Sequence, residues 1–140
     1  MEDILIRRVK VDRSRTLQEM LNALNCTSYV NESVVETIPQ GIGDEVEVYF
    51  LRVSRFLNNV KVERLYKKHS LKAADVYSLA AVNEADPTFA RTYFNGTVWK
   101  VSKNIWGSIA FRSNAEDGLK VFVDYGKGWY ENWFLAGLRD

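Results

Sequence analysis

Few side chains in this chain could act as a nucleophile or as its base. Cys26 is the only cysteine and His69 is the only histidine. A cysteine nucleophile needs a base beside it and a third group that orients the base. His69 falls in a lysine-rich segment, where positive neighbours favour the neutral imidazole. We expect a buried thiol and a packing histidine, although the sequence leaves open whether Cys26 and His69 lie near each other.

Metal and cofactor chemistry has no signal in the sequence. One cysteine and one histidine do not furnish a zinc tetrahedron, and no calcium-loop spacing occurs. The glycine-rich segment 41–43 precedes a predicted strand and is not followed by Gly-Lys-Ser or Gly-Lys-Thr, so we interpret it as a turn rather than a phosphate loop. We expect no cofactor.

Charge is balanced overall but unevenly distributed, with 19 basic and 18 acidic residues. The segment 32–47 contains acids and no base, whereas the segment 52–72 contains one acid, Glu63, among many bases. The two segments could face each other or be solvated separately. Alternatively, the basic segment is a docking surface for an anionic partner. In that case the candidate binding residues are Arg55, Arg64, Lys67 and Lys68.

Tryptophan is concentrated at the C-terminal end. All four indoles follow position 98, at Trp99, Trp106, Trp129 and Trp133. This part of the chain has alternating runs at 97–101, 105–112, 119–125 and 129–138, joined by short polar connections. The tryptophans lie in the first, second and fourth of these runs. Short connections between consecutive strands predict antiparallel hairpins, and hence a four-stranded antiparallel meander. We expect its indoles to form the core, and the alternative is an exposed aromatic platform for bases, sugars or peptides.

Helical periodicity dominates the other half of the chain. Apolar spacing predicts amphipathic helices at 16–25, 59–69 and 75–85. Thr16 and Glu19 have the spacing of a capping box. Strands are predicted at 4–11 and 45–53, whereas 29–38 is an extended segment or short strand, 70–74 is a link and 88–95 is irregular.

These elements define the predicted fold class. We expect an α+β protein with a C-terminal four-stranded antiparallel meander plus a strand in the N-terminal half at 45–53. Two or three amphipathic helices cover the sheet. The length of 140 residues predicts that 1–140 forms a single domain.

The composition also indicates a cellular setting. A single cysteine allows no intramolecular disulfide. No apolar run approaches the ~18 residues of a membrane span, and no secretion signal is evident. We therefore expect a cytoplasmic protein without a membrane partner.

Several strings carry a family resemblance over most of the chain. They include the segments 31–35, 43–48, 77–90 and 95–97, together with Trp99-Lys100 and the closing segment 133–139. On these strings the chain resembles a family of small uncharacterised bacterial proteins. The resemblance implies kinship and carries no function.

The sequence thus favours a small non-enzymatic binding or interaction protein with a protein partner. The alternative is a nucleic-acid-associated protein that uses the basic stretch 52–72. A helix-turn-helix is disfavoured because the helix at 75–85 carries Asp75 and Glu84 and no base, which does not suit a phosphate-lined groove. The third hypothesis is an enzyme of unrecognised type.

Overall fold

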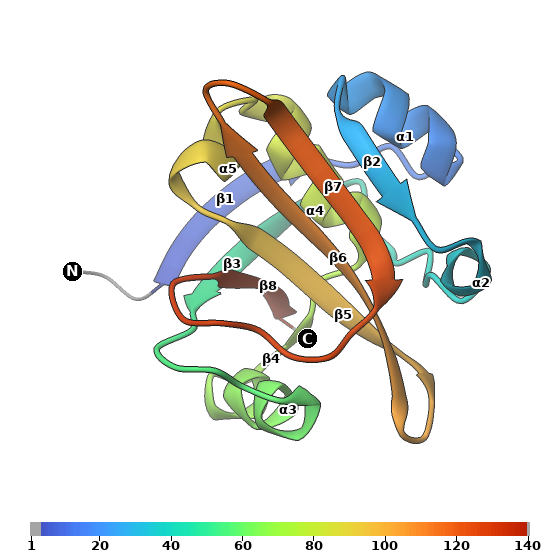
Figure 1. Cartoon of the computed structure of the whole chain (residues 1–140). Helices are drawn as coiled ribbons and strands as arrows, with labels where there is room; N and C mark the ends of the chain where they lie inside the picture. The colour runs from blue at the N-terminus through green and yellow to red at the C-terminus, as the bar shows by residue number, and fades with distance from the viewer. Residues whose placement is uncertain (1–3, 140) are drawn as a thin grey trace.

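A computed structural model describes residues 4–139 and shows one mixed β-sheet of eight strands with five helices. The strand order is β1-β3-β8-β5-β6-β7-β2, and β4 pairs with β8 beside this path (Figure 1). The strands are β1 (Ile4–Lys10), β2 (Thr27–Val30), β3 (Glu45–Arg52), β4 (Leu71–Ala73), β5 (Asn95–Ser102), β6 (Ile105–Asn114), β7 (Gly118–Tyr125) and β8 (Phe134–Arg139). The helices are α1 (Leu17–Leu24), α2 (Glu32–Val35), α3 (Asn59–Lys68), α4 (Val76–Ala85) and α5 (Phe89–Thr92).

The long helices begin where local capping predicts. Thr16 accepts a hydrogen bond from the Glu19 N–H, and the Glu19 carboxylate accepts one from the Thr16 N–H, which confirms the capping box of α1. Asp75 caps α4 by accepting from the Ser78 N–H at 3.0 Å. Such caps satisfy N–H groups that lack a partner within the helix, so the start of each helix is fixed locally.

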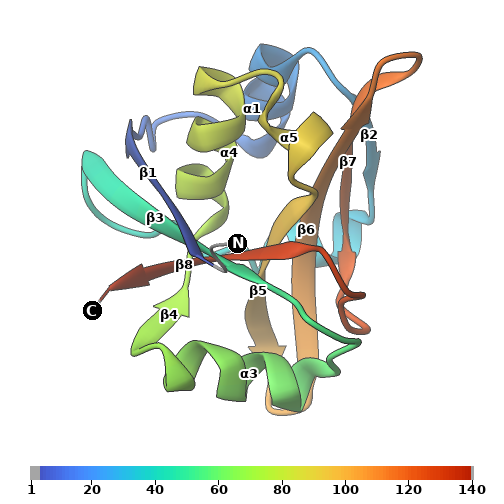
Figure 2. The ribbon, with the colours of Figure 1, turned by 90° about the vertical axis from the view of Figure 1, so that its left-hand side faces the viewer.

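The curved sheet separates two apolar cores. Helices α1, α4 and α5 lie on one side of it and α3 lies on the other (Figure 2). The larger core includes Phe50, Leu79 and Phe111, all fully buried. The smaller core lies beneath α3 and includes Val62 and Trp129. Because each fully buried large apolar side chain contributes about 1.5–3 kcal/mol, both cores stabilise the sheet that they share.

The predicted four-stranded antiparallel meander is wrong. Strands β5, β6 and β7 do form an antiparallel meander, but β8 pairs in parallel with β5 and antiparallel with β3 and β4. The segment 126–133 is a loop rather than the start of a strand. Gly128 at φ 127° and Asn132 at φ 72° turn its backbone, so the chain crosses to the far side of β5. Only Trp129 makes a strand-like contact there, an isolated bridge to Leu57.

Four short elements could not be predicted from the periodicity of apolar residues. They are β2, which pairs in parallel with β7, the three-residue β4, and the one-turn helices α2 and α5. Runs this short give too few positions to define a period of 2 or 3.6. The predicted link at 70–74 therefore contains a strand, and the predicted irregular segment 88–95 contains a helix.

The tryptophans are divided between core and boundary. Trp99 and Trp129 are buried, whereas Trp106 and Trp133 are half-buried. The Trp129 ring lies against Gly96, where an added Cβ would fall 2.2 Å from the indole. Packing of indoles in the core is thus confirmed for two of the four.

Within residues 4–139, no helix combines the length and the apolar character needed to cross a membrane.

Candidate binding cleft

The sheet forks along β8. One edge of β8 pairs with β3 over Phe134–Gly137. The opposite edge pairs first with β5, at Phe134 and Leu135, and then with β4 from Gly137 to Arg139. At the point of divergence the Thr97 hydroxyl donates to the Ala74 carbonyl at 2.6 Å. Beyond it β5 continues along β6 while β4 stays with β8, so the two strands separate.

A cleft of about 1020 Å³ occupies this fork. Its walls come from β3, β4, β5, the start of β6, the end of β8 and helix α3, with Arg8 of β1, the start of α4 and the loop 39–42. The apolar and aromatic lining includes Tyr49, Leu71, Val98, Trp99, Trp106 and Leu138. The size and this lining are typical of a ligand-binding site.

Two contacts fix the Trp99 indole in the cleft wall. Its Nε1 donates to the Thr37 hydroxyl at 2.8 Å. Its ring covers Gly107 on the neighbouring strand, where an added Cβ would lie 2.3 Å from the ring. Only glycine leaves room for the indole at this register position, so β6 shapes the wall that β5 presents.

The acidic side chains of the cleft are all engaged in ion pairs. Arg8 pairs with Glu45 at 3.4 Å and with Glu47 at 3.3 Å. Lys100 pairs with Glu63 at 3.4 Å, and Asp75 is paired with Arg13. Glu45 and Glu47 therefore face β1.

Two bases of the cleft have no carboxylate partner among residues 4–139, namely Lys67 and Arg139. The Arg139 Nε donates to the Tyr49 hydroxyl at 2.9 Å, and its guanidinium carbon lies 4.9 Å from the centre of the Tyr49 ring. The hydrogen bond that Arg139 donates to Tyr49 raises the pKa of Arg139, so the guanidinium stays charged. These groups leave the cleft with an excess of positive charge.

Arg13 holds the loop that forms the remaining wall. Its guanidinium donates to the carbonyls of Gln40 at 2.8 Å, Ile42 at 2.8 Å and Gly43 at 3.1 Å. The loop can approach so closely because Gly41 has a φ of 71° and because an added Cβ there would lie 2.4 Å from Asp75. The segment 41–43 is thus a structural turn, as its sequence predicts.

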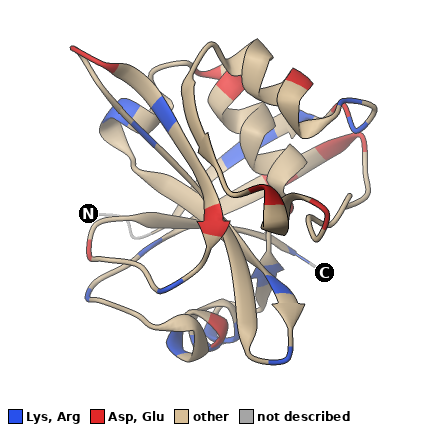
Figure 3. Ribbon diagram, turned by 45° about the vertical axis from the view of Figure 1, so that its right-hand side comes forward, with Lys and Arg blue, Asp and Glu red and all other residues tan. Residues whose placement is uncertain are grey.

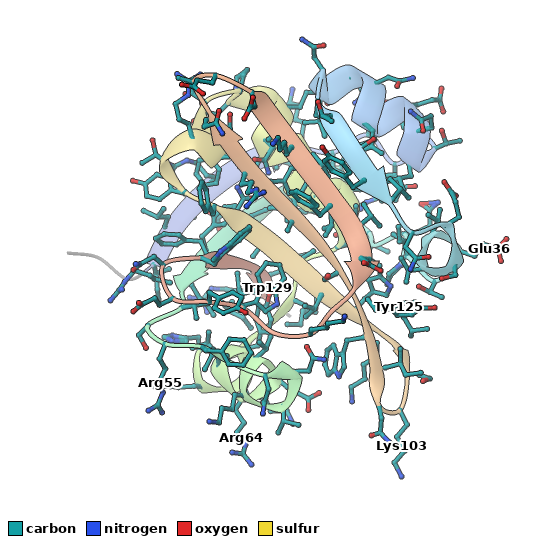
Figure 4. All side chains as sticks on the ribbon, in the orientation of Figure 1. Glu36, Arg55, Arg64, Lys103, Tyr125 and Trp129 are labelled. Atoms are coloured by element: carbon teal, nitrogen blue, oxygen red, sulfur yellow. The ribbon has the colours of Figure 1, made fainter. Side chains whose placement is uncertain are left out.

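The four predicted anion-binding residues are exposed on α3 and in the loop before it. Lys67 lines the cleft. Arg64 and Lys68 are exposed on α3, and Arg55 is exposed in the loop before it, outside the cleft lining. Arg55 and Arg64 point away from the body of the protein (Figure 4). Only Lys67 of the four lines the cleft, and anion binding by the four residues stays a prediction.

The sequence did not predict Tyr49 and Arg139 as site residues. It also did not predict that β5 forms a wall of the cleft. These groups meet only because β8 pairs with three different strands. No local spacing connects position 49 with position 139, so no motif could have found the pair.

Cys26 and His69 lie in different parts of the fold. Cys26 connects α1 to β2, His69 follows α3, and these elements lie at opposite ends of the molecule (Figures 1 and 2). The Cys26 Sγ lies 3.5 Å from the Leu21 carbonyl, and burial raises the pKa of its thiol. Both side chains are half-buried, so the expectation of a buried thiol is met only in part.

The described part of the chain contains no group of three or more His, Cys, Asp or Glu side chains placed to hold a metal ion. Comparisons with protein-family models, curated proteins and solved structures find no match to this chain.

Proposed function

We propose that this chain is a small non-enzymatic binding protein and that the cleft at the fork of the sheet receives part of a protein partner. The observation that carries this proposal is the cleft itself, about 1020 Å³ in volume, with aromatic walls and an excess of positive charge. Concave sites with an apolar lining and a few polar groups are the usual places for specific binding.

The side chains of the cleft favour binding over catalysis. Among the described residues that line it there is no serine, threonine, cysteine or histidine. Its four acids are held in ion pairs with arginine or lysine. Such a lining offers apolar contact and charge recognition.

A cytoplasmic location is part of the same proposal. A single cysteine is consistent with a reducing compartment, where structural disulfide bonds are rare.

Selection from a displayed library of seven-residue peptides tests the site. Peptides that bind the wild-type protein are expected to lose binding to Ala73→Trp, because Ala73 lines the cleft and an indole there would fill it. Ala23→Trp is the matched control, since Ala23 is exposed on α1 and does not line the cleft.

Amide chemical shifts of the wild-type protein provide a second measurement that does not depend on a variant. Selected peptides are expected to shift amides of β4, β5 and the end of β8. Peptides that bind Ala73→Trp unchanged and shift amides elsewhere would overturn the proposal.

A second candidate function rests on the outer side of α3. Arg64 and Lys68 on α3 and Arg55 in the loop before it are exposed and form no ion pair with another described residue. Basic residues dominate this helix (Figure 3). Such a surface could follow a nucleic-acid backbone without sequence specificity.

Salt dependence distinguishes this candidate. Binding to single- or double-stranded nucleic acid would weaken steeply between 50 and 200 mM salt, by about tenfold or more for several phosphate contacts. Arg64→Gln and Lys68→Gln would each reduce the salt slope, whereas Lys120→Gln on β7 would leave it unchanged. Affinity without salt dependence would exclude the phosphate-binding mode.

A further inference from the structure

We propose that an extended segment of the partner protein adds to β5 as a new strand inside the cleft, with an Asp or Glu side chain bound by Lys67 and Arg139. This inference rests on the proposed function, because it assigns the chemistry of the partner to the same cleft. It makes β5 the element that recognises the partner's backbone.

The first support is an edge of β5 that lacks a strand partner. Beside β6, the only other pairing of β5 in the described structure is with β8, at Asn95 and Gly96. From Thr97 onward that second edge has no strand beside it, and residues 98–100 line the cleft. An unpaired edge presents N–H and C=O groups that an extended peptide can satisfy.

The register of β5 indicates which residues face the incoming strand. The Phe134 N–H donates to the Phe94 carbonyl at 2.8 Å, so position 94 directs its backbone group toward β8. Backbone groups alternate along a strand, so the even-numbered positions share this edge. Val98 and Lys100 come next on it, beyond the end of the β8 pairing.

The walls of the cleft define the side chains that fit. An added strand places alternate side chains on opposite faces. One set would contact Trp99 and the other Trp106, because Trp106 pairs with Lys100 and Trp99 lies on the opposite face of β5. The bound segment is therefore expected to carry an aliphatic or aromatic side chain on each face.

Charge complementarity selects an acidic segment. Lys67 and Arg139 line the cleft and have no carboxylate partner among residues 4–139, whereas the acids of the cleft are already paired. An added carboxylate would accept charge-assisted hydrogen bonds from these two bases. A basic segment would meet uncompensated positive charge.

The same argument disfavours a second copy of this chain as the occupant. The strands at the two ends of the sheet are β1, which carries Arg7, Arg8 and Lys10, and β2, which carries no acid. Neither supplies the carboxylate that the cleft requires. The β5 edge of a second copy is itself recessed in a cleft, so two such edges cannot meet.

Backbone methylation of a selected peptide tests strand addition. The probe is an acidic seven-residue peptide from the library, synthesised with one N-methyl group at a time and measured by fluorescence polarisation on the wild-type protein. Methylation of alternate amides should weaken binding by about fivefold to tenfold, since each removes one backbone hydrogen bond. Methylation of the intervening amides should change it less than about twofold.

The charge arm uses Lys67→Gln and Arg139→Gln. Each substitution is expected to weaken binding of the acidic peptide by about fivefold. The affinity of the same peptide with Gln in place of its acid should stay unchanged. Lys68→Gln is the matched control on the same helix, because Lys68 does not line the cleft.

The outcomes separate the two proposals. Peptides that bind in the cleft but tolerate every N-methyl group would overturn strand addition and leave the binding site in place. Acidic and Gln peptides that bind equally well would overturn the carboxylate contact. Peptides that keep full affinity for Ala73→Trp would overturn the cleft as the binding site, and the present inference with it.

Discussion

The Nη1 of Arg13 lies 2.6 Å from the Oδ2 of Asp75, joining the segment after β1 to the first turn of α4. The Asp75 carboxylate also accepts hydrogen bonds from the Ser78 N–H and hydroxyl. One arginine therefore connects a helix cap with the loop that forms a wall of the cleft. Residues 13 and 75 lie far apart in the sequence, so their pairing depends on the packing of α4 against β1.

Removal of this arginine is expected to destabilise the protein strongly. The side chains of Arg13 and Asp75 are 16% and 6% exposed, so Arg13→Ala leaves a largely buried carboxylate without its cation. We expect the free energy of unfolding to fall by about 3 kcal/mol in urea denaturation, as for a buried pair that loses one partner. Peptides that bind the cleft should also bind more weakly, because the loop 40–43 loses its donors.

Arg8→Ala is the matched control for this effect. Arg8 also pairs with carboxylates, but its side chain is 65% exposed. We expect a loss below about 1 kcal/mol, as for exposed ion pairs. Equal losses for the two variants would show that burial is not what makes the Arg13 pair important.

Gly107→Ala is expected to displace the Trp99 indole. The new methyl group would fall 2.3 Å from the ring, whose Nε1 is held by a hydrogen bond to Thr37. We expect a loss of about 1–3 kcal/mol from overpacking and a shift in tryptophan fluorescence. Gly126→Ala is the control, because its nearest neighbour would be the Ser108 Cβ at 3.4 Å. An unchanged emission spectrum in Gly107→Ala would contradict the packing described here.

Tyr66 is expected to make the protein sensitive to alkaline pH. Its hydroxyl is buried and donates to the Ala136 carbonyl at 2.6 Å, and burial raises the pKa of the phenol above its ordinary value of 10.0. Above about pH 10 the phenol ionises in the unfolded chain but not in the folded one, so the unfolded state binds fewer protons. The free energy of unfolding therefore falls as pH rises beyond 10, and below that pH the contribution is fully present.

Tyr66→Phe removes the ionisable phenol and so isolates its contribution to the pH dependence of stability. The variant should lose about 1 kcal/mol at pH 8 with the hydrogen bond, and it should lose less further stability than the wild type between pH 8 and 11. In this variant the Ala136 carbonyl still accepts a hydrogen bond from the Ala74 N–H at 2.9 Å, which limits the loss of stability. Tyr130→Phe is the control, because Tyr130 is 69% exposed and should leave the alkaline slope unchanged. Parallel slopes for Tyr66→Phe and the wild type would refute the assignment.

The Cys26 thiol is expected to react slowly. Burial raises its pKa above 9.0, and the thiolate is the reactive form. Alkylation by iodoacetamide at pH 8 should be at least about tenfold slower in the folded protein than in urea, and its rate should still rise beyond pH 9. A rate that levels off near neutral pH would indicate an activating base that the structure does not place beside Cys26.

Much of the secondary structure was accessible from local pattern. Thr16 and Glu19 marked the start of α1, and alternation marked β3 and the hairpins of β5, β6 and β7. These signals arise from neighbours a few positions apart, so they survive without knowledge of the fold. The prediction of a strand at 129–138 was wrong for the loop 126–133. Trp129 and Trp133 have the spacing of one face of a strand, but Gly128 and Asn132 turn the chain.

The candidate site was accessible only in part. Lys67 was predicted from the basic segment and does line the cleft, whereas Arg55 and Arg64 lie outside it. Arg139 was not predicted, because its role depends on Tyr49 and on the end of β8. Anion binding by the four basic residues stays a prediction that the nucleic-acid measurements can test.

By itself the sequence determined the elements and their caps, since period, capping and charge act over a few residues. Only the tertiary structure decided which strands pair with β8, and hence that the sheet forks there. Strand pairing is settled by the burial of whole faces, which joins positions as distant as Tyr49 and Arg139. The cleft, its unpaired edge and its two unpartnered bases follow from that long-range choice.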